Sequence, residues 1–359
     1  MDRTRLCPEE ILSGAAAQAA IAGGRALPLA GGALAFAAVE AIVRVPAGGS
    51  VSTHLTLPEL RERAAAEDRA QTIAAELARL SVPRPLWAGF TLDRPLIVGI
   101  LNITPDSFSD GGDFFDAAGA AAHGEAMLAE GADIIDIGGE STRPGASPVS
   151  PEEECRRVVP VIEALAGAGA TVSIDTRRPL VMRAALDAGA RIINDVTALS
   201  GDPESLGVAA TSGAPVVLMH MKGEPRTMQR TPSYDDVALD VLDYLEARIA
   251  ACEAAGIPRG RILVDPGIGF GKDQIDHNLP LLRWIALLHA TGCGVLVGLS
   301  RKSFIGRLSG GAAPKDRVPG SLAGALWCWG RGVQVMRVHD VAATCQALTI
   351  WRGIRDSAG

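Results

Sequence analysis

The sequence predicts an α/β fold, a (β/α)8 TIM barrel preceded by a small N-terminal α+β extension. From Pro95 onward the 359-residue chain repeats one unit, in which a short apolar run ends in a polar loop and an amphipathic segment follows. Eight such runs occur, near residues 96–102, 133–139, 171–176, 191–196, 215–220, 261–267, 294–300 and 333–339. They span about 250 residues, which is typical of a closed barrel, whereas a doubly wound sheet usually has fewer strands.

The first of these runs shows how the repeated unit is organised. Residues Leu96 to Leu101 are continuously apolar, which favours a strand covered on both faces, as in a parallel sheet surrounded by helices. Asn102 follows at once, and Pro105, Gly111 and Gly112 prevent regular structure in the next stretch. We therefore expect a polar loop at the carboxyl end of this strand, where barrel enzymes carry their chemistry.

Helices are expected between the strands. Their periodic apolar residues and start signals predict helices at Glu152–Ala166, Pro179–Ala188, Tyr234–Ala255 and Ser321–Arg331. Pro151 and Pro179 are placed as first-turn residues, because a proline there lacks only an N–H group that would be unpaired anyway.

Residues 1–92 have a different character. They begin rich in alanine and glycine, continue with an alternating segment at Ala33–Val45 and end in a charged, helical stretch at Leu57–Leu80. No set of chemically reactive residues is found here. We predict an appended subdomain that serves packing or oligomer contact, joined by a linker at Ser81–Pro85 to a catalytic barrel at residues 93–359.

The composition of the chain argues against nucleic acids and membranes as binding partners. A net charge of −7 and the lack of a basic run argue against a nucleic-acid surface, so small molecules are expected as substrates. The six cysteines lie far apart without a C-x-x-C pair, which is typical of buried thiols in a cytoplasmic protein. The Ala-rich segment at Ile11–Gly24 is too short to cross a bilayer, for which about 20 apolar residues are needed, so no membrane partner is expected.

Polar residues end almost every predicted strand. In chain order they are Asn102, the segment Gly138–Gly145, Asp175, Asn194 with Asp195, His220 after Met219, Asp265, Arg301 with Lys302, and Arg337 with His339. An unpaired buried carboxylate costs several kcal/mol, so a repeated placement at one end of a barrel indicates a shared ligand.

Two kinds of group are present in this set. Asp175, Asn194 and Asp265 suit the N–H and C=O edge of a flat heterocycle. Donors for phosphate oxygens are found at Asn102, Thr142, Arg143, Arg337 and His339. Asn102 also offers a hard oxygen ligand for Mg²⁺, so one site is expected to hold a ring and an anion.

Several long motifs carry a family resemblance. They are Leu101–Gly112 (LNITPDSFSDGG), Gly138–Gly145 (GGESTRPG), Ile192–Asp195 (IIND), Asp265–Gly267 (DPG), Ser300–Ser303 (SRKS) and Arg337–Asp340 (RVHD). Together they resemble dihydropteroate synthase from about residue 95 to the end. The resemblance implies a folate-pathway transferase that joins 6-hydroxymethyl-7,8-dihydropterin diphosphate to p-aminobenzoate and releases pyrophosphate. It also implies assistance by Mg²⁺ and a homodimer.

The resemblance further implies a role for each matched residue. The catalytic set is Asn102, Asp110, Arg143, Lys302, Arg337 and His339, with Asn102 as the Mg²⁺ ligand. The pterin pocket falls on Asp175, Asn194, Met219, Asp265, Lys302 and Arg337. The p-aminobenzoate surroundings fall on Thr142, Arg143, Phe270 and Ser303, and Phe108 and Asp110 lie in the first loop.

The reaction makes modest demands on proton transfer. The dihydropterin ring can delocalise positive charge at its methylene group, so we expect pyrophosphate to leave before the arylamine attacks. The amine is already a nucleophile near neutral pH, and no nucleophile elbow or Cys/His pair is present in the sequence.

Two other functions remain open from the sequence. A pterin-binding methyltransferase domain would use the same barrel and ring-edge groups, but the expected diphosphate donors argue against it. A non-catalytic paralogue would retain the barrel as a binding module, and the near-complete motif set argues against that. Asp340 is expected to cap or pair within its loop, and the same role is left open for Asp195 beside a ligand contact. His220 fits a wall position and a ligand contact equally well.

Overall fold

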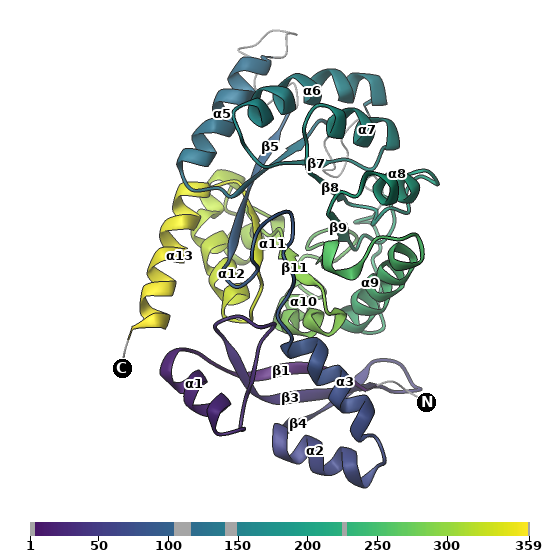
Figure 1. Ribbon diagram of the computed structural model, residues 1–359, viewed down its shortest axis with the longest axis vertical. Helices are drawn as coiled ribbons and strands as arrows, with labels where there is room; N and C mark the ends of the chain where they lie inside the picture. Colours follow the sequence, from purple (N-terminus) through teal and green to yellow (C-terminus); the bar gives the residue numbers. More distant parts are fainter. Residues whose placement is uncertain (1–3, 104–115, 141–148, 225–227, 358–359) are drawn as a thin grey trace.

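The computed structural model describes residues 4–103, 116–140, 149–224 and 228–357, and every structural statement below concerns these residues. Eight parallel strands close into a barrel in the order β10-β11-β12-β5-β6-β7-β8-β9, which confirms the predicted fold (Figure 1). The strands are β5 (Leu96–Asn102), β6 (Ile134–Gly138), β7 (Val172–Asp175), β8 (Ile192–Asp195), β9 (Val216–Met219), β10 (Ile262–Asp265), β11 (Gly294–Val297) and β12 (Val335–Val338).

Helices surround this barrel. They are α5 (Ala117–Ala129), α6 (Pro151–Gly167), α7 (Pro179–Asp187), α8 (Ser205–Ser212), α9 (Val237–Ala254), α10 (Asn278–Arg283), α11 (Ser303–Leu308), α12 (Val318–Trp329) and α13 (Val341–Asp356), with 3-10 turns η1 (Arg259–Arg261), η2 (Ile285–Thr291) and η3 (Pro314–Arg317). Pro151 and Pro179 are first-turn residues, as predicted. The Ser150 hydroxyl accepts from the Glu153 N–H, so a side-chain cap fixes the start of α6.

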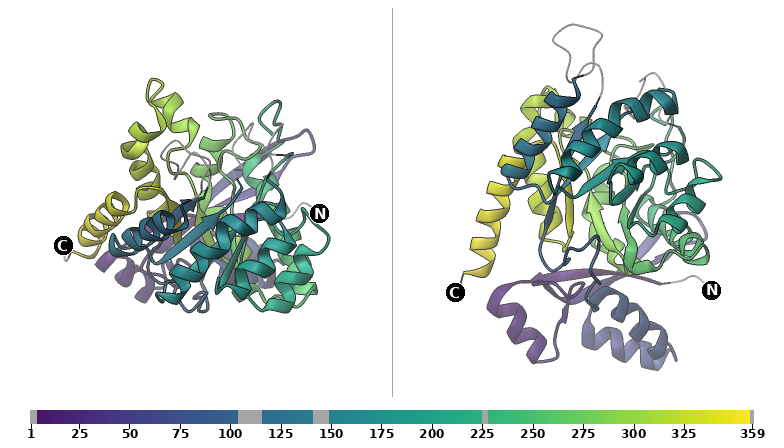
Figure 2. Two further views of the ribbon diagram at one scale, coloured as in Figure 1. Left: turned by 90° about the horizontal axis from the view of Figure 1, so that it is seen from above. Right: turned by 45° about the horizontal axis from the view of Figure 1, so that its top comes forward.

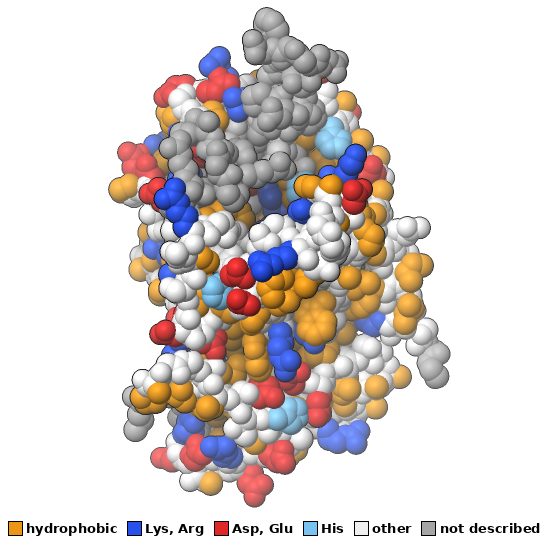
Figure 3. Space-filling model, turned by 180° about the vertical axis from the view of Figure 1, so that it is seen from behind, with side chains coloured by type: hydrophobic (Ala, Val, Ile, Leu, Met, Phe, Trp, Pro, Cys, Tyr) orange, Lys and Arg blue, Asp and Glu red, His pale blue; other side chains and the backbone are white. Residues whose placement is uncertain are grey.

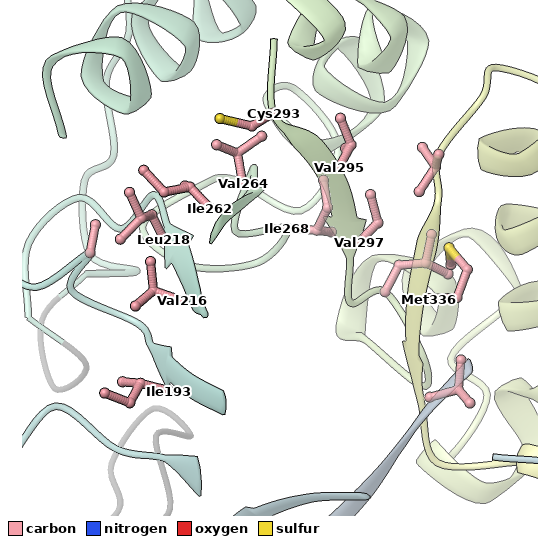
Figure 4. Packing of buried hydrophobic residues seen from close by; sticks show 14 of the residues in the cluster. Ile193, Val216, Leu218, Ile262, Val264, Ile268, Cys293, Val295, Val297 and Met336 are labelled. Atoms are coloured by element: carbon pink, nitrogen blue, oxygen red, sulfur yellow. The ribbon is translucent and has the colours of Figure 1, made fainter. Parts of the chain in front are cut away.

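The main core lies between the strands and the outer helices. Side chains that point outward from successive strands, such as Val216, Val264 and Val295, pack there (Figure 4). Burial of this kind of surface is the largest favourable contribution to folding. It holds the strand ends rigidly, which is what a site built on them requires.

A second cluster fills the barrel interior at its amino end. Trp87 and Leu92 pack there against strand residues such as Leu96 and Leu263. The Trp87 indole Nε1 donates to the Arg261 carbonyl oxygen at 3.1 Å. Residues that precede 93 therefore close the base of the barrel.

The amino-terminal part forms an α+β unit. Its elements are β1 (Arg5–Leu12), α1 (Gly14–Ala22), β2 (Leu27–Pro28), β3 (Ala35–Arg44), β4 (Ser50–Thr56), α2 (Leu57–Ala66) and α3 (Ala70–Ser81). The antiparallel partners of β3 are β1, β2 and β4. The predicted helical stretch at Leu57–Leu80 is helical but consists of two helices, because α2 ends at Ala66 and the backbone at Asp68 is left-handed, with φ of 54°.

This unit packs beneath the barrel, at the end away from the carboxyl ends of the strands (Figures 1 and 2). Cys7 and Ile42 join the main barrel core from the extension. Arg5 pairs with Glu246 of α9 at 2.8 Å, and Arg44 pairs with Asp240 at 2.8 Å. Apolar packing and ion pairs therefore both join the two parts.

Candidate active site

The predicted polar residues meet at the carboxyl mouth of the barrel. Asn102, Asp175, Met219 and Asp265 are the last residues of their strands. In the strand register Asn102 lies beside Gly138, Gly138 beside Asp175, and Asp175 beside Asn194. Met219 likewise lies beside Asp265. Barrel closure thus brings ring-edge acceptors from separate parts of the chain to one rim.

Arg337, near the end of β12, lies between two carboxylates. Its Nε donates to Asp136 Oδ2 at 2.6 Å, and its Nη2 donates to Asp175 Oδ2 at 2.7 Å. Burial lowers the pKa of Arg337, but the two carboxylates outweigh that effect and the pKa is raised. The guanidinium is therefore a permanent cation at the mouth.

Asp136 was not among the residues predicted for the site. It lies in the middle of β6, and its Oδ2 also accepts from Asn194 Nδ2 at 3.0 Å. One carboxylate thereby links two predicted site residues. The available signal was a single charge inside the apolar run Ile134–Gly138.

Asp265, Phe270 and Lys302 form the opposite part of the rim. The Lys302 ammonium lies 4.7 Å from the centroid of the Phe270 ring and donates to the Ile268 carbonyl oxygen. Asp265 Oδ1 accepts from the Gly267 N–H at 2.7 Å. Gly267 has φ of 66°, and a Cβ there would collide with the His220 carbonyl oxygen, so this turn requires glycine.

Burial shifts the titration of the charged groups. It raises the pKa of Asp175 to about 7, although Arg337 opposes this. It lowers the pKa of Lys302 to about 8, although Asp265 opposes this. The pKa of Asp265 is also raised, chiefly by burial. Shifts of this kind are typical of functional sites.

His339 and Ser303 occupy the remaining side of the mouth. His339 Nδ1 lies 3.1 Å from Ser300 Oγ, so this hydroxyl orients the imidazole. Ser303 is exposed and is the first residue of α11. Asp340 instead pairs with Arg301 Nε at 2.9 Å, which confirms its predicted role within the loop.

Asp195 is the last residue of β8 and caps the turn that follows, which is one of the roles that the sequence left open for it. Its two oxygens accept from the N–H groups of Thr197 and Leu199, at 2.7 and 3.1 Å. These bonds shape the turn after β8.

His220 is a wall residue rather than part of the rim. It is buried against Tyr244, with ring centroids 4.9 Å apart, and its Nδ1 lies 2.8 Å from the fully buried Nζ of Lys272. Lys272 also donates to the carbonyl oxygens of Gly267 and Phe270, at 2.9 and 3.0 Å. The sequence did not single out this lysine, which holds the loop that carries Phe270.

Four predicted site residues cannot be placed. Phe108, Asp110, Thr142 and Arg143 lie outside the described residues. Glu140, the last described residue before Thr142 and Arg143, accepts from Arg178 Nη2 at 2.8 Å.

Asn102 is the residue expected to bind Mg²⁺. Within the described ranges no group of three or more His, Cys, Asp and Glu side chains could hold a metal ion. Asn102 supplies a hard oxygen at the mouth, beside Gly138. A single protein oxygen fits Mg²⁺ if substrate phosphates and water complete its coordination, which is the usual arrangement for this ion.

The sequence of this chain is similar to those of known proteins. The family described as pterin binding enzyme matches residues 98–339. A dihydropteroate synthase of Neisseria meningitidis is 53% identical over 270 residues, which cover 73% of this chain and 94% of the relative. The dihydropteroate synthase of Escherichia coli is 49% identical over 260 residues, which cover 72% of this chain and 91% of the relative.

Solved structures are also similar. Xanthomonas albilineans dihydropteroate synthase with 4-aminobenzoic acid has a TM-score of 0.71 and 51% identity, covering 77% of this chain and 99% of that one. The same organism's enzyme in complex with 7,8-dihydropteroate has a TM-score of 0.69 and 48% identity. The match covers 77% of this chain and 100% of that one.

Proposed function

The chain belongs to the pterin-binding enzymes, among the dihydropteroate synthases, and from this membership we propose how its residues divide the reaction. It is a transferase that condenses 6-hydroxymethyl-7,8-dihydropterin diphosphate with p-aminobenzoate to give 7,8-dihydropteroate and pyrophosphate. The observation that carries the division is the rim itself, where ring-edge acceptors on β7, β8 and β10 face a fixed cation on β12.

Asp175, Asn194 and Asp265 bind the edge of the pterin ring in this proposal. Their acceptors match the ring's N–H and amino groups, and an analogue without those groups would leave buried polar atoms unpaired. Lys302 donates to the ring carbonyl, and Met219 packs against the ring. The support is their position at one mouth, where Asn194, Met219 and Asp265 are buried and Asp175 and Lys302 are half-buried.

Asn102, Arg337 and His339 act on the diphosphate. Arg337 is a permanent cation, so it stabilises the charge that develops on departing pyrophosphate. Bound Mg²⁺, held by Asn102 together with phosphate oxygens, would neutralise part of the same charge. Asp110 and Arg143 complete the proposed catalytic set from the segments that are not described.

The p-aminobenzoate surroundings are Thr142, Arg143, Phe270 and Ser303. Phe270 presents a ring held under the Lys302 ammonium, which suits contact with the flat arylamine. Ser303 offers a hydroxyl to the carboxylate. The amine needs only to be positioned over the methylene carbon, because it attacks in its neutral form.

The direct experiment measures pyrophosphate release from the pterin diphosphate with and without p-aminobenzoate. Release that depends on the arylamine, with 7,8-dihydropteroate as product, supports the proposed division. Variants at Asn194 and Arg337 should then separate ring binding from diphosphate departure. A protein that binds the pterin but releases no pyrophosphate would contradict it.

We further propose a homodimer through α12 and α13. These helices pack together and expose Trp327, Ile350 and Ile354, at 42%, 61% and 72%. The space-filling view from behind shows that this face of the molecule exposes hydrophobic side chains among charged ones (Figure 3). Exposed apolar surface of this kind is typical of interfaces. Analytical ultracentrifugation tests this, since Ile354→Glu should yield monomers.

We also propose that the protein is cytoplasmic and that it consists of two parts, an extension and a catalytic barrel. The six cysteines are free, as expected in a reducing compartment. No helix in the described ranges is long and apolar enough to cross a membrane. Residues 1–92 have their own sheet and a core built on Leu6, Phe36 and Leu77, and residues 93–359 carry the catalytic barrel.

A further inference from the structure

Asp136 is buried where no structural need explains a charge. It lies inside the barrel on β6, is 1% exposed, and has apolar neighbours on both sides in the chain. Removing a carboxylate from water costs several kcal/mol before its partners are counted. Its partners therefore show what it does.

Both partners of Asp136 belong to the proposed ligand site. A single oxygen, Oδ2, accepts from Arg337 Nε at 2.6 Å and from Asn194 Nδ2 at 3.0 Å. We propose that Asp136 is a positioning residue, which orients the Arg337 guanidinium and the Asn194 amide before the pterin diphosphate binds. This inference rests on the proposed roles of Arg337 and Asn194.

The orientation of Asn194 follows from the chemistry of the pair. An ionised carboxylate only accepts hydrogen bonds, so the amide must turn its NH₂ group toward Asp136. The Asn194 carbonyl oxygen then points away from that contact and is available as an acceptor. Without Asp136 the amide could rotate and present two donors to the N–H edge of the ring, which is a mismatch.

The orientation of Arg337 follows from two bonds. Asp136 holds its Nε and Asp175 holds its Nη2, so the plane of the guanidinium is fixed at two points. None of the described residues accepts from Nη1, which leaves that nitrogen for the diphosphate. A preorganised donor need not reorient when charge develops, and this is how such groups lower a barrier.

A role in stability alone does not explain this arrangement. Within the described part of the chain, Asp136 Oδ1 is buried and has no hydrogen-bond partner. A carboxylate placed only to hold the fold would be expected to use both oxygens. Well-packed apolar residues in place of a buried charged set are often neutral or stabilising.

The first test compares Asp136→Asn with a matched control, Asp133→Asn, whose residue directly precedes β6. Asp133 is partly buried at the other end of β6, where it accepts from the Ile97 N–H at 2.8 Å and pairs with Arg94. Calorimetric titration with the pterin diphosphate should show a loss of roughly ten- to a hundredfold for Asp136→Asn, as for other orienting residues. Asp133→Asn should change thermal stability and leave this affinity unchanged. Equal affinity in Asp136→Asn and the parent protein overturns the proposal.

A double-mutant cycle separates positioning from a general structural role. If Asp136 acts through Arg337, the double variant Asp136→Asn/Arg337→Gln should be little worse than Arg337→Gln alone. Independent effects that multiply would overturn the proposal. If Arg337→Gln by itself leaves binding and turnover unchanged, the assigned role of Arg337 fails instead, so the two failures are distinguishable.

The pH profile supplies a second readout. The charge of Asp136 contributes to the raised pKa of Asp175. Asp136→Asn should therefore move the acid limb of pterin-diphosphate binding to lower pH, whereas a merely loosened fold would leave the limb in place.

A measurement on the unaltered protein covers the case in which Asp136→Asn does not fold. With labelled arginine, the Nε–H proton of Arg337 should exchange slowly with solvent before any ligand is added, because it is buried in the bond to Asp136. The signal can be assigned by its loss in Arg337→Gln. Rapid exchange in the ligand-free protein would show that the guanidinium is not held and would overturn the proposal.

Discussion

Asp265→Asn should weaken pterin binding without weakening the fold. Asp265 is 6% exposed at the end of β10, and its Oδ1 accepts from the Gly267 N–H at 2.7 Å. Asparagine can keep that bond through its carbonyl oxygen. Its NH₂ group would then take the place of the second carboxylate oxygen, so a donor would face the N–H groups of the ring.

The magnitude follows from the bond that is lost. A hydrogen bond to a charged group contributes about 1.5–3 kcal/mol, which corresponds to roughly a ten- to hundredfold loss of affinity. The free energy of unfolding should rise or stay unchanged in Asp265→Asn. Burial raises the pKa of Asp265, which means that the folded protein disfavours this charge, and the substitution removes it.

Calorimetry with the pterin diphosphate and thermal unfolding measure the two effects. Asp195→Asn is the matched control, because Asp195 is a buried aspartate at the end of another barrel strand, β8, but caps a turn through Thr197 and Leu199. We expect this control to lower the melting temperature and to keep pterin affinity. An unchanged dissociation constant in Asp265→Asn would place the carboxylate outside the pocket.

Three further predictions test other parts of the site. A chain that begins at Pro85 keeps Trp87 and every strand-end residue, so it should retain turnover but melt at a lower temperature, and a folded protein without turnover would show that the extension contributes to the site. Pterin-diphosphate affinity should be greatest between pH about 7 and about 8, because Asp175 takes up a proton below that range and Lys302 loses one above it. Lys302→Arg should abolish the alkaline limb only, and an unchanged limb would assign it to another group. Positional isotope exchange tests the order of events: ¹⁸O in the bridging position should scramble in the enzyme without arylamine, and Asp110→Asn should lower turnover with pterin affinity nearly intact. No scrambling while pyrophosphate stays bound would indicate concerted displacement.

The extension shows one limit of local patterns. A helical stretch at Leu57–Leu80 was expected because its apolar residues recur with helical spacing. The break at Glu67–Arg69 arises where Asp68 adopts a left-handed backbone, which lets α2 and α3 both pack on one face of the sheet. Aspartate tolerates that conformation at little cost, so the sequence carries only a weak sign of the turn.

The eight strands and the polar residues that end them could be predicted from the amino-acid sequence alone. Continuous apolar runs and helical periodicity are local properties, and parallel strands in a barrel place their carboxyl ends at one mouth. The chemistry of these residues predicted a ring and an anion at one site, and the motif resemblance predicted which substrate group each residue binds.

Which of these residues are in contact could not be predicted and depends on the tertiary fold. Arg337 and Asp136 are 201 residues apart in sequence, and barrel closure between β12 and β5 brings them within a hydrogen bond. The buried contact of Lys272 with His220 likewise depends on how two loops fold over each other. Such pairings are set by register and packing between distant segments, and no local pattern in the chain encodes them.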